Sequence, residues 1–435
     1  MTKALSTFIV VILTILILSC FIKVAESSEA PTVQWSRSFG GQKTERAYSV
    51  IQTNDEGYAL VGSTDSFGAG GSDFWLIKTD SSGNMQWNKT YGGPNDDIAS
   101  AVLEANDGGF VIAGMTASYG AGGFDFWLVK TDSLGNMQWN KTYGGAEDDF
   151  ATSVIKTSDG GFVMTGWTNS FGAGGEDLWL VKTDSAGNMI WNRTYGGQFN
   201  DEAHGLIQTS DSGYVIAGDT TFKSGNEDAL LVKTDSTGNM QWNQTYGGSE
   251  LDTTLSIVQL NDGSYVLGGY TSSFGAGLND GWLIKADFSG IMQWNKTYGG
   301  PYDDYFYSMV HTNDGGFALA GETRVSHDGP SNFWLIKADS KGNVELNKIN
   351  DGSTDNFAYS LIQTKDGGFA LAGVMNTEGT SEDALLVKLN STSGTAELPI
   401  LPIIMLTMVI LVIVLLVILY ITRKRKVSLK TERTP

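Results

Sequence analysis

Cysteine and histidine are nearly absent from this 435-residue sequence, which contains one cysteine, Cys20, and three histidines, His204, His311 and His327. A single cysteine excludes an intramolecular disulfide framework and a cysteine-rich zinc site. Three histidines far apart in the sequence give little basis for imidazole chemistry. The sequence therefore predicts no disulfide and no metal site built from these residue types.

Proline and basic residues are also scarce. Seven prolines stand against 55 glycines, and 11% of the residues are aromatic, a composition typical of packed strands joined by tight turns. Lys and Arg number 28 against 48 Asp and Glu, so the formal net charge is −20. Because nucleic-acid binding depends on neutralising phosphates with basic residues, this charge argues against a nucleic-acid partner.

Two long apolar runs lie at the ends of the chain. Residues 1–27 hold Lys3, an apolar run and a small polar stretch, which is typical of a signal peptide; an uncleaved N-terminal anchor is the alternative. Residues 401–421 are almost entirely apolar. At about 1.5 Å per residue they are long enough to cross the roughly 30 Å hydrocarbon core of a bilayer. This run predicts a transmembrane helix.

The charges that flank this run predict the orientation of the chain. Residues 422–435 begin with the basic stretch Arg423–Lys426, and basic residues next to a transmembrane helix favour the cytoplasmic side. The sequence therefore predicts a single-pass protein of the cell membrane, with a cytoplasmic tail, a linker at 394–400 and an ectodomain at 28–393 outside the cell. The acidity of this ectodomain favours solubility and attracts divalent cations.

The central region is an internal repeat with a period of 51 or 52 residues. One series is a tryptophan that becomes leucine in the seventh copy: Trp35, Trp87, Trp139, Trp191, Trp242, Trp294 and Leu346. A second series with the same spacing consists of aspartates in glycine-rich turns: Asp55, Asp107, Asp159, Asp211, Asp262, Asp314 and Asp366. Such a period indicates a stack of equivalent structural units.

Each period predicts four short strands. In the second copy these are residues 98–103, 110–115, 126–130 and 137–143, and the intervening segments contain the Asp, Asn and Gly residues that favour tight turns. Four antiparallel strands in about 50 residues are typical of one blade of a β-propeller. The third strand is continuously apolar, which is expected where both of its faces are covered.

The order of strands at the two ends of the repeat predicts a closed ring. Residues 33–41 match a fourth strand, whereas residues 384–388 match a third strand. One blade is therefore split between the two ends, and pairing them would close the circle. The predicted fold is all-β: a seven-bladed β-propeller with strand-exchange closure, plus one C-terminal transmembrane helix.

Acidic residues recur in two series on one predicted face of the propeller. One series lies at the start of the third strands and the other follows the loops between blades. They define a candidate ligand-binding face: Asp73, Asp97, Asp125, Asp149, Asp177, Asp201, Asp228, Asp252, Asp280 and Asp304. Ca²⁺ is a candidate ion because it prefers carboxylate and carbonyl oxygens. The alternative is that these aspartates bond backbone N–H groups in turns, so no cofactor is predicted.

Asn-x-Thr tripeptides recur on the predicted fourth strand. These candidate glycosylation sites are Asn88, Asn140, Asn192, Asn243 and Asn295, with a further one at Asn390. On an outer strand they would lie at the rim of the ring, where a glycan would improve solubility and block edge pairing. Alternatively, duplication of one unit copied the same tripeptide.

An enzymatic function would require the repeat symmetry to be broken. Hydrolysis of a glycoside needs two carboxylates in different environments, whereas the repeated acids are nearly identical from copy to copy. The asymmetric residues are His204, His311, His327, Arg46 and Arg324. His327 and Arg324 share a divergent loop and form a candidate binding spot, but the pattern assigns no catalytic residue.

The repeat resembles a known class of surface proteins. The Thr-x-Asp-Gly-Gly-aromatic element at Thr157–Gly166 and Thr312–Gly321, together with Asp-x-Trp-Leu-hydrophobic-Lys-Thr-Asp-x-x-Gly-Asn, is similar to the Asp-Gly-Gly propeller repeats of archaeal and bacterial cell-surface proteins. The resemblance covers residues 32–390. It also extends to kelch blades in period, although no cysteine matches the copper-site cysteine of kelch oxidases. The resemblance implies a surface β-propeller.

Two functional classes follow from these observations. The first is a membrane-anchored cell-surface propeller that acts as a non-enzymatic binding or cell-envelope module for a protein or a glycan. The alternative is an extracellular polysaccharide hydrolase or lyase on the same scaffold. A deep axial pocket with one unequal pair of carboxylates and a nearby arginine would favour the enzyme.

Overall fold

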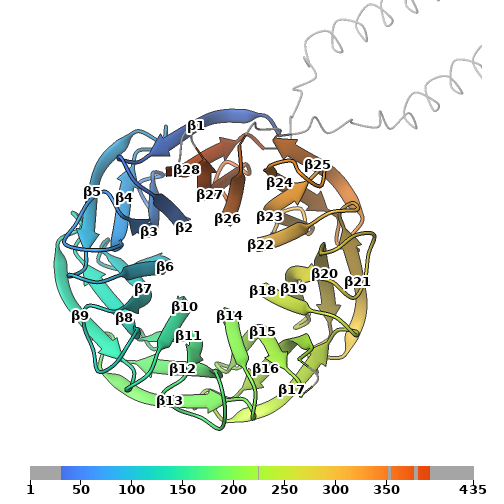
Figure 1. Ribbon diagram of the computed structural model, residues 1–435, viewed down its shortest axis with the longest axis horizontal. Coiled ribbons are helices and arrows are strands. Elements are labelled where there is room, and N and C mark those ends of the chain that lie inside the picture. Colours follow the sequence, from blue (N-terminus) through green and yellow to red (C-terminus); the bar gives the residue numbers. More distant parts are fainter. Residues whose placement is uncertain (1–30, 224, 351–353, 377–380, 392–435) are drawn as a thin grey trace, which may run out of the picture. The chain divides into compact units, whose positions relative to one another are not determined.

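The computed structural model describes residues 31–223, 225–350, 354–376 and 381–391. Within these ranges there are 28 β-strands and no helix, and they form seven four-stranded antiparallel sheets. Figure 1 shows the sheets as blades of a closed ring, with the first strand of each blade nearest the centre and the fourth outermost. The predicted all-β seven-bladed propeller is confirmed.

The first four blades follow the chain in order. Their strands are β2 (Glu45–Gln52), β3 (Tyr58–Thr64), β4 (Asp73–Thr79) and β5 (Met85–Tyr91); β6 (Asp97–Glu104), β7 (Phe110–Thr116), β8 (Asp125–Thr131) and β9 (Met137–Tyr143); β10 (Asp149–Lys156), β11 (Phe162–Thr168), β12 (Asp177–Thr183) and β13 (Met189–Tyr195); β14 (Asp201–Gln208), β15 (Tyr214–Thr221), β16 (Glu227–Thr234) and β17 (Met240–Tyr246).

The last three blades contain the split unit. Their strands are β18 (Asp252–Gln259), β19 (Tyr265–Thr271), β20 (Asp280–Ala286) and β21 (Met292–Tyr298); β22 (Asp304–His311), β23 (Phe317–Arg324), β24 (Ser331–Ala338) and β25 (Val344–Asn350); β26 (Asn356–Gln363), β27 (Phe369–Asn376), β28 (Glu382–Leu389) and β1 (Val33–Phe39).

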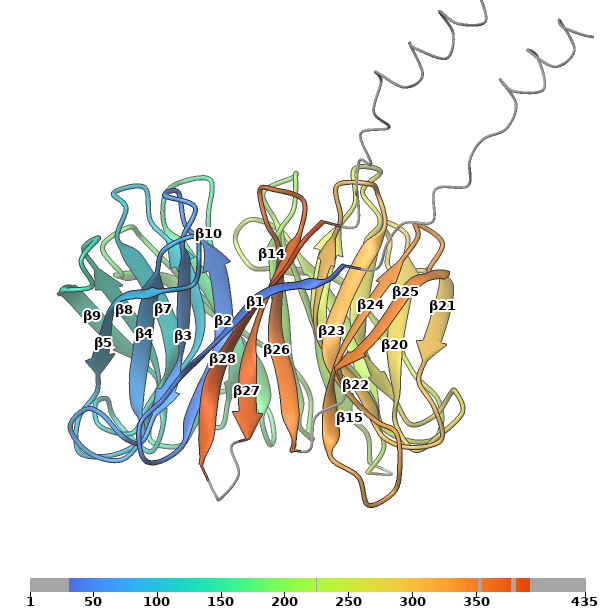
Figure 2. The ribbon, with the colours of Figure 1, turned by 90° about the horizontal axis from the view of Figure 1, so that it is seen from above.

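The ring closes by pairing its first strand with its last. β1 lies antiparallel to β28, with Phe39 opposite Ala384 and Trp35 opposite Lys388, and Figure 2 shows β1 running along β28. Beyond the ladder, the Asn390 N–H donates to the carbonyl of Thr32 at 3.1 Å. The predicted strand-exchange closure is therefore confirmed.

Burial of apolar side chains between neighbouring blades holds the ring together. Every residue of the third strand β4 is buried, whereas every residue of the outer strand β5 except Tyr91 is exposed or partly exposed. Phe74 of one blade packs on Trp127 of the next, with ring centroids 4.6 Å apart. Because both faces of each sheet are covered in this way, the middle of the third strand is an unbroken apolar run, residues 74–77 in β4.

The repeated aspartate of the glycine-rich turn is tied to a buried lysine of the third strand. Asp107 accepts from Lys130 Nζ at 2.8 Å and from the Gly109 N–H at 3.0 Å. This link recurs in all seven blades. The hydrogen bond from Lys130 lowers the pKa of Asp107. The turn and the third strand are thus held by one ion pair per blade.

A second repeated link joins the third and fourth strands. In five blades the indole Nε1 of a third-strand tryptophan donates to an asparagine of the fourth strand, as Trp127 does to Asn140 Oδ1 at 3.2 Å. In the fourth blade, leucine replaces the tryptophan. Leu230 and Asn243 both line a cavity of about 380 Å³ there.

The predicted segments at the chain ends lie outside the described residues. They are the signal peptide at 1–27, the linker at 394–400, the transmembrane helix at 401–421 and the tail at 422–435. Across the portion of the chain that the structure does describe, no helix has the length and apolar character needed to cross a membrane.

Deleting residues 28–43 tests the closure. Loss of β1 would leave one edge of β28 unpaired and uncover part of the seventh blade, so we expect the melting temperature to fall by about 10 °C or more. Deleting residues 28–30 alone is the control and should leave the melt unchanged. An equal melt for both deletions would contradict a closure that depends on β1.

The Leu230→Trp variant tests the link between the third and fourth strands. The added ring would bury apolar area in the cavity and offer its N–H to Asn243, so we expect the melting temperature to rise by about 2–5 °C. The matched control is Leu385→Trp in the seventh blade, where the fourth strand carries Ser36 in place of asparagine. A lower melting temperature for Leu230→Trp would contradict the interpretation.

Candidate functional site

The predicted acidic face consists of buried residues that hold turns together. All the predicted aspartates except Asp228 are buried, and nearly all begin a strand. Asp97 is typical: its carboxylate accepts from the Gly93 N–H and the Ser118 hydroxyl, both at 2.8 Å, and from the Thr116 hydroxyl. These bonds fix the loop between blades against the inner strand.

The two acidic series come together in five pairs, each of which joins the third strand of one blade to the inner strand of the next, from the first blade to the sixth. Asp73 and Asp97 flank Gly92, where an added Cβ would lie 2.0 Å from Asp73 Oδ1 and 2.7 Å from Asp97 Oδ2. Burial, with the charge of Asp97 as a further contribution, raises the pKa of Asp73. Each pair offers two carboxylates, whereas Ca²⁺ takes six to eight oxygens, so Ca²⁺ binding at these residues stays a prediction.

The asparagines of the six predicted glycosylation sites are all exposed: Asn88, Asn140, Asn192, Asn243, Asn295 and Asn390. Four of them accept a hydrogen bond from a tryptophan through the side-chain oxygen. A glycan is attached through the amide nitrogen, so this link and glycosylation are compatible. Glycosylation itself stays a prediction.

A set of residues that breaks the repeat symmetry lies on the inner strands. Every inner strand contains a bulge, seen in β14 as a register shift between Ala203 and Gly205. Directly beside these positions, the second strand carries glycine in all seven blades. At Gly166, for instance, an added Cβ would lie 1.8 Å from the carbonyl oxygen of Phe150. The backbone around the bulge is thus the same in all seven blades, and only the side chains beside it differ.

We call the variable residues the axial belt, and they occupy three positions in each blade. Position one is the inner-strand residue that lies two places before the bulge. Position two is the bulge residue itself. Position three is the residue on the second strand of the blade that pairs with position one. The belt comprises Arg46, Ile98, Phe150, Glu202, Thr253, Tyr305 and Phe357; Tyr48, Ser100, Thr152, His204, Leu255, Tyr307 and Tyr359; and Ser63, Met115, Trp167, Asp219, Tyr270, Glu322 and Val374.

Aromatic rings make up much of the axial belt and touch from blade to blade. Phe150 stacks on Trp167 with centroids 5.2 Å apart, and Trp167 meets the ring of His204 in the next blade at 6.0 Å. Tyr307 and Tyr359, from the sixth and seventh blades, are 5.3 Å apart. All five side chains are partly exposed. The belt is therefore an accessible aromatic surface.

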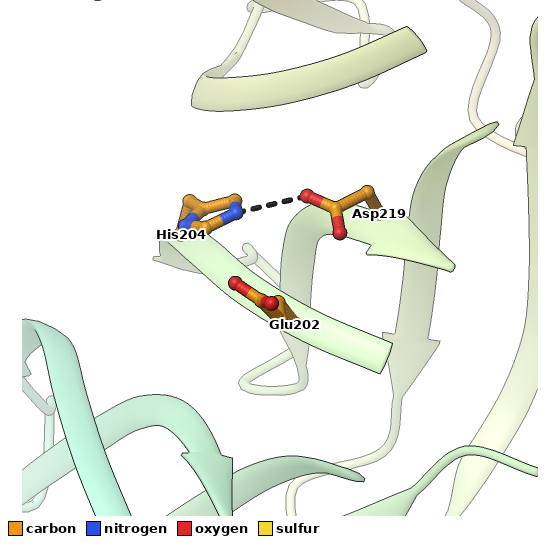
Figure 3. Close-up of side chains that lie close together, drawn as sticks. All are labelled: Glu202, His204 and Asp219. Carbon is orange, nitrogen blue, oxygen red and sulfur yellow. Dashed lines mark hydrogen bonds and ion pairs between the residues drawn. The ribbon is translucent and has the colours of Figure 1, made fainter. Parts of the chain in front are cut away.

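Glu202, His204 and Asp219 form a polar cluster within the belt, which we call the blade-four cluster. Figure 3 shows the three side chains converging from β14 and β15. His204 Nε2 lies 2.9 Å from Asp219 Oδ2, and one ligand atom from each residue lies within 4.8 Å of the others. Thr253, from the fifth blade, donates its hydroxyl to Asp219 Oδ2 at 2.6 Å.

The blade-four cluster concentrates negative charge. Burial, followed by the charge of Asp219, raises the pKa of Glu202 to about 8. Burial lowers the pKa of His204, but the hydrogen bond and charge of Asp219, with Glu202, raise it overall. Burial and the charges of Asp219 and Glu176 also raise the pKa of Glu227. A cation in this cluster would relieve the repulsion between its carboxylates.

Sequence reasoning found part of this site. Arg46 and His204 were expected to break the symmetry, and both lie in the axial belt, where Arg46 pairs with Glu382 of the seventh blade. His327, by contrast, pairs with its neighbour Asp328 and has 82% of its side chain exposed, whereas Arg324 pairs with Asp303. Glu202 and Asp219 were missed. Glu202 and Asp219 stand at two repeat positions where the residue changes from copy to copy, and this variation is the sequence signal that could have found them.

Comparison with known proteins establishes the fold class. No family profile matches the chain. The regulatory protein FlaEY of Caulobacter vibrioides is 25% identical in an alignment of 187 residues. The match covers 37% of this chain and 20% of FlaEY, so this chain matches about a fifth of the length of that relative.

Among solved structures, the Pan2 WD40 domain of Neurospora crassa is similar with a TM-score of 0.53 and 12% identity, covering 83% of this chain and 96% of that domain. A protein of unknown function from Dyadobacter fermentans has a TM-score of 0.49 and 11% identity, covering 83% of this chain and all of the other. At 12% identity the likeness to the Pan2 domain shows the fold alone. The chain is a β-propeller, and its function has to be inferred from the residues of its own site because a fold does not determine a function.

The pH dependence of stability tests the environment of Glu202. A carboxyl whose pKa is raised from 4.5 to about 8 on folding destabilises the protein as the pH rises through that interval. We therefore expect Glu202→Gln to raise the melting temperature relative to the parent chain at pH 8 and much less at pH 5, in buffer containing EDTA.

Glu250→Gln, at an exposed position, is the control and should give the same small difference at both pH values. An equal effect of Glu202→Gln at pH 5 and pH 8 would mean that Glu202 titrates as it does in the unfolded chain.

Proposed function

We propose that this protein is a membrane-anchored, cell-surface β-propeller that binds a glycan at its axial belt without chemically altering it. The observation that carries the proposal is the location of the symmetry breaking. The blades share their turns, their ion pairs and their buried aromatic residues, yet they differ at the belt positions. A residue that served only the fold would recur like the others, so this variation supports a role of the belt in binding a ligand.

The chemistry of the belt favours a glycan. A sugar ring has apolar C–H faces and a polar hydroxyl edge, and the partly exposed Phe150 and Trp167 offer flat rings beside hydrogen-bonding groups at Glu202 and Asp219. A stable protein partner requires about 800 Å² of surface on each side. The belt side chains are only partly exposed, which fits a narrow chain better than a broad protein surface.

The proposed location rests on the sequence and agrees with the exposed residues. The apolar runs and basic tail support a single-pass membrane protein, and the resemblance to Asp-Gly-Gly surface repeats supports a place in the cell envelope. The exposed Asn-x-Thr asparagines are suited to carry glycans in such a compartment.

One observation favours the alternative, a polysaccharide hydrolase or lyase. Glu202 and Asp219 are two carboxylates that face each other across neighbouring strands and approach within 4.8 Å. Retaining glycosidases place their two carboxyl groups about 5 Å apart. This pair occurs in one blade only, as catalysis would require.

A glycan array probed with the full-length chain tests the binding function. We expect Phe150→Leu and Trp167→Leu each to weaken binding about tenfold, because each removes a stacking ring worth roughly 1.4 kcal/mol. Phe288→Leu is the matched control, since Phe288 is 70% exposed and lies outside the belt. Absence of glycan binding, or binding that both belt variants retain in full, would refute the proposal.

The same glycans, incubated with the chain and assayed for new reducing ends or unsaturated products, separate the two candidate functions. Binding without product supports the binding module. Product formed by the parent chain and lost in Glu202→Gln supports the enzyme.

A further inference from the structure

We infer that the blade-four cluster, Glu202, His204 and Asp219, is a binding site for one divalent transition-metal ion of the Zn²⁺ or Mn²⁺ type. The inference concerns metal binding by the protein alone. It holds whether or not the axial belt binds a glycan.

The geometry of the cluster matches a metal centre. It offers one imidazole nitrogen and two carboxylate groups, with one ligand atom of each within 4.8 Å of the others. His204 Nε2 and Asp219 Oδ2 are 2.9 Å apart. Two donors bound at about 2.1 Å from one ion are separated by about 3.0 Å at the right angle of an octahedral site and by about 3.4 Å at the tetrahedral angle that Zn²⁺ prefers, so this hydrogen-bonded pair would open by about 0.5 Å or less to hold the ion.

The local fold explains why the three side chains converge. Glu202 and Asp219 are directly opposite each other on β14 and β15, so their side chains lie on the same face of the sheet. His204 is two residues beyond Glu202, at the bulge in β14. Residues two apart on a regular strand point to the same side. The bulge redirects the side chain of His204, which here points toward Asp219. The donors therefore come from a rigid sheet rather than from a loop.

A residue of the neighbouring blade supports this arrangement. Thr253 donates its hydroxyl to Asp219 Oδ2 at 2.6 Å. Groups that hydrogen-bond to metal ligands typically fix the orientation of those ligands. Trp167, on the other side, places its ring edge-on to His204 at 6.0 Å. The cluster is thus held from both neighbouring blades.

The cluster is not part of the repeated scaffold. The equivalent three positions in the other blades are Arg46, Tyr48 and Ser63; Ile98, Ser100 and Met115; Phe150, Thr152 and Trp167; Thr253, Leu255 and Tyr270; Tyr305, Tyr307 and Glu322; and Phe357, Tyr359 and Val374. None of these sets offers more than one carboxylate, and none offers an imidazole. Stability of a blade therefore does not require the Glu–His–Asp set.

The donor set also indicates the kind of ion. Imidazole with carboxylates suits Zn²⁺ and Mn²⁺, whereas Ca²⁺ takes oxygen ligands only and needs six to eight of them. The nearby carboxylates of Glu227 and Glu176 add negative charge that attracts a dication. Three protein ligands leave coordination positions for water or for an oxygen of a bound ligand.

Calorimetric titration tests the inference on the full-length chain, produced without a histidine tag and freed of metal with EDTA. We expect one equivalent of Zn²⁺ to bind, Mn²⁺ to compete for the same site and Ca²⁺ to fail to displace Zn²⁺. His204→Gln and Asp219→Asn should each weaken Zn²⁺ binding at least tenfold. His311→Gln, which removes a histidine outside the belt, is the control and should bind Zn²⁺ as the parent chain does.

A measurement on the unmodified chain covers the case in which a cluster variant does not fold. The chain has three histidines, so a histidine-selective ¹H–¹⁵N spectrum contains three ring systems, and one equivalent of Zn²⁺ should shift only that of His204. Absence of stoichiometric Zn²⁺ binding, equal loss in His311→Gln, or a shift confined to another histidine would overturn the inference. Glycan binding that survives EDTA leaves the proposed function standing, so the two can fail separately.

Discussion

The packing of one blade against the next is the interaction on which the rest of this structure depends. A single four-stranded sheet cannot cover its own two apolar faces, and contacts such as Phe74 with Trp127 bury one blade only by using its neighbour. In an open array the two terminal blades would each expose a face. Closing the circle removes both, and for this reason the seventh blade combines β1 with β26, β27 and β28.

This constraint separates scaffold residues from site residues. The Lys–Asp pairs and the buried aspartates at the strand starts recur because every blade must fasten its turns in the same way, and most of their oxygens accept hydrogen bonds from lysine, backbone or hydroxyl donors. The axial belt has no such duty. Its members can therefore vary, and charged, aromatic and hydroxyl groups accumulate there on neighbouring blades.

The sequence predicted the fold in detail and the site only in part, for a physical reason. The period and the four strands per copy are local signals that recur along the chain, and the split blade follows from the order of strands at the two ends of the repeat. The site arises from contacts between copies, such as Trp167 with His204 and Arg46 with Glu382. It also depends on a bulge that interrupts strand alternation, so Glu202 and Asp219 could not be matched to His204 from spacing alone.

The closure also determines how a mechanical load would pass through the protein. Thr32 and Asn390 are hydrogen-bonded to each other, so the chain enters and leaves the propeller at one spot. β28 lies between β27 and β1, with a hydrogen-bonded ladder on each side. Traction on the segment after Asn390 alone would have to shear both ladders together, whereas traction that separates Thr32 from Asn390 would peel β1 away one bond at a time. Resistance to pulling therefore depends on which end is held.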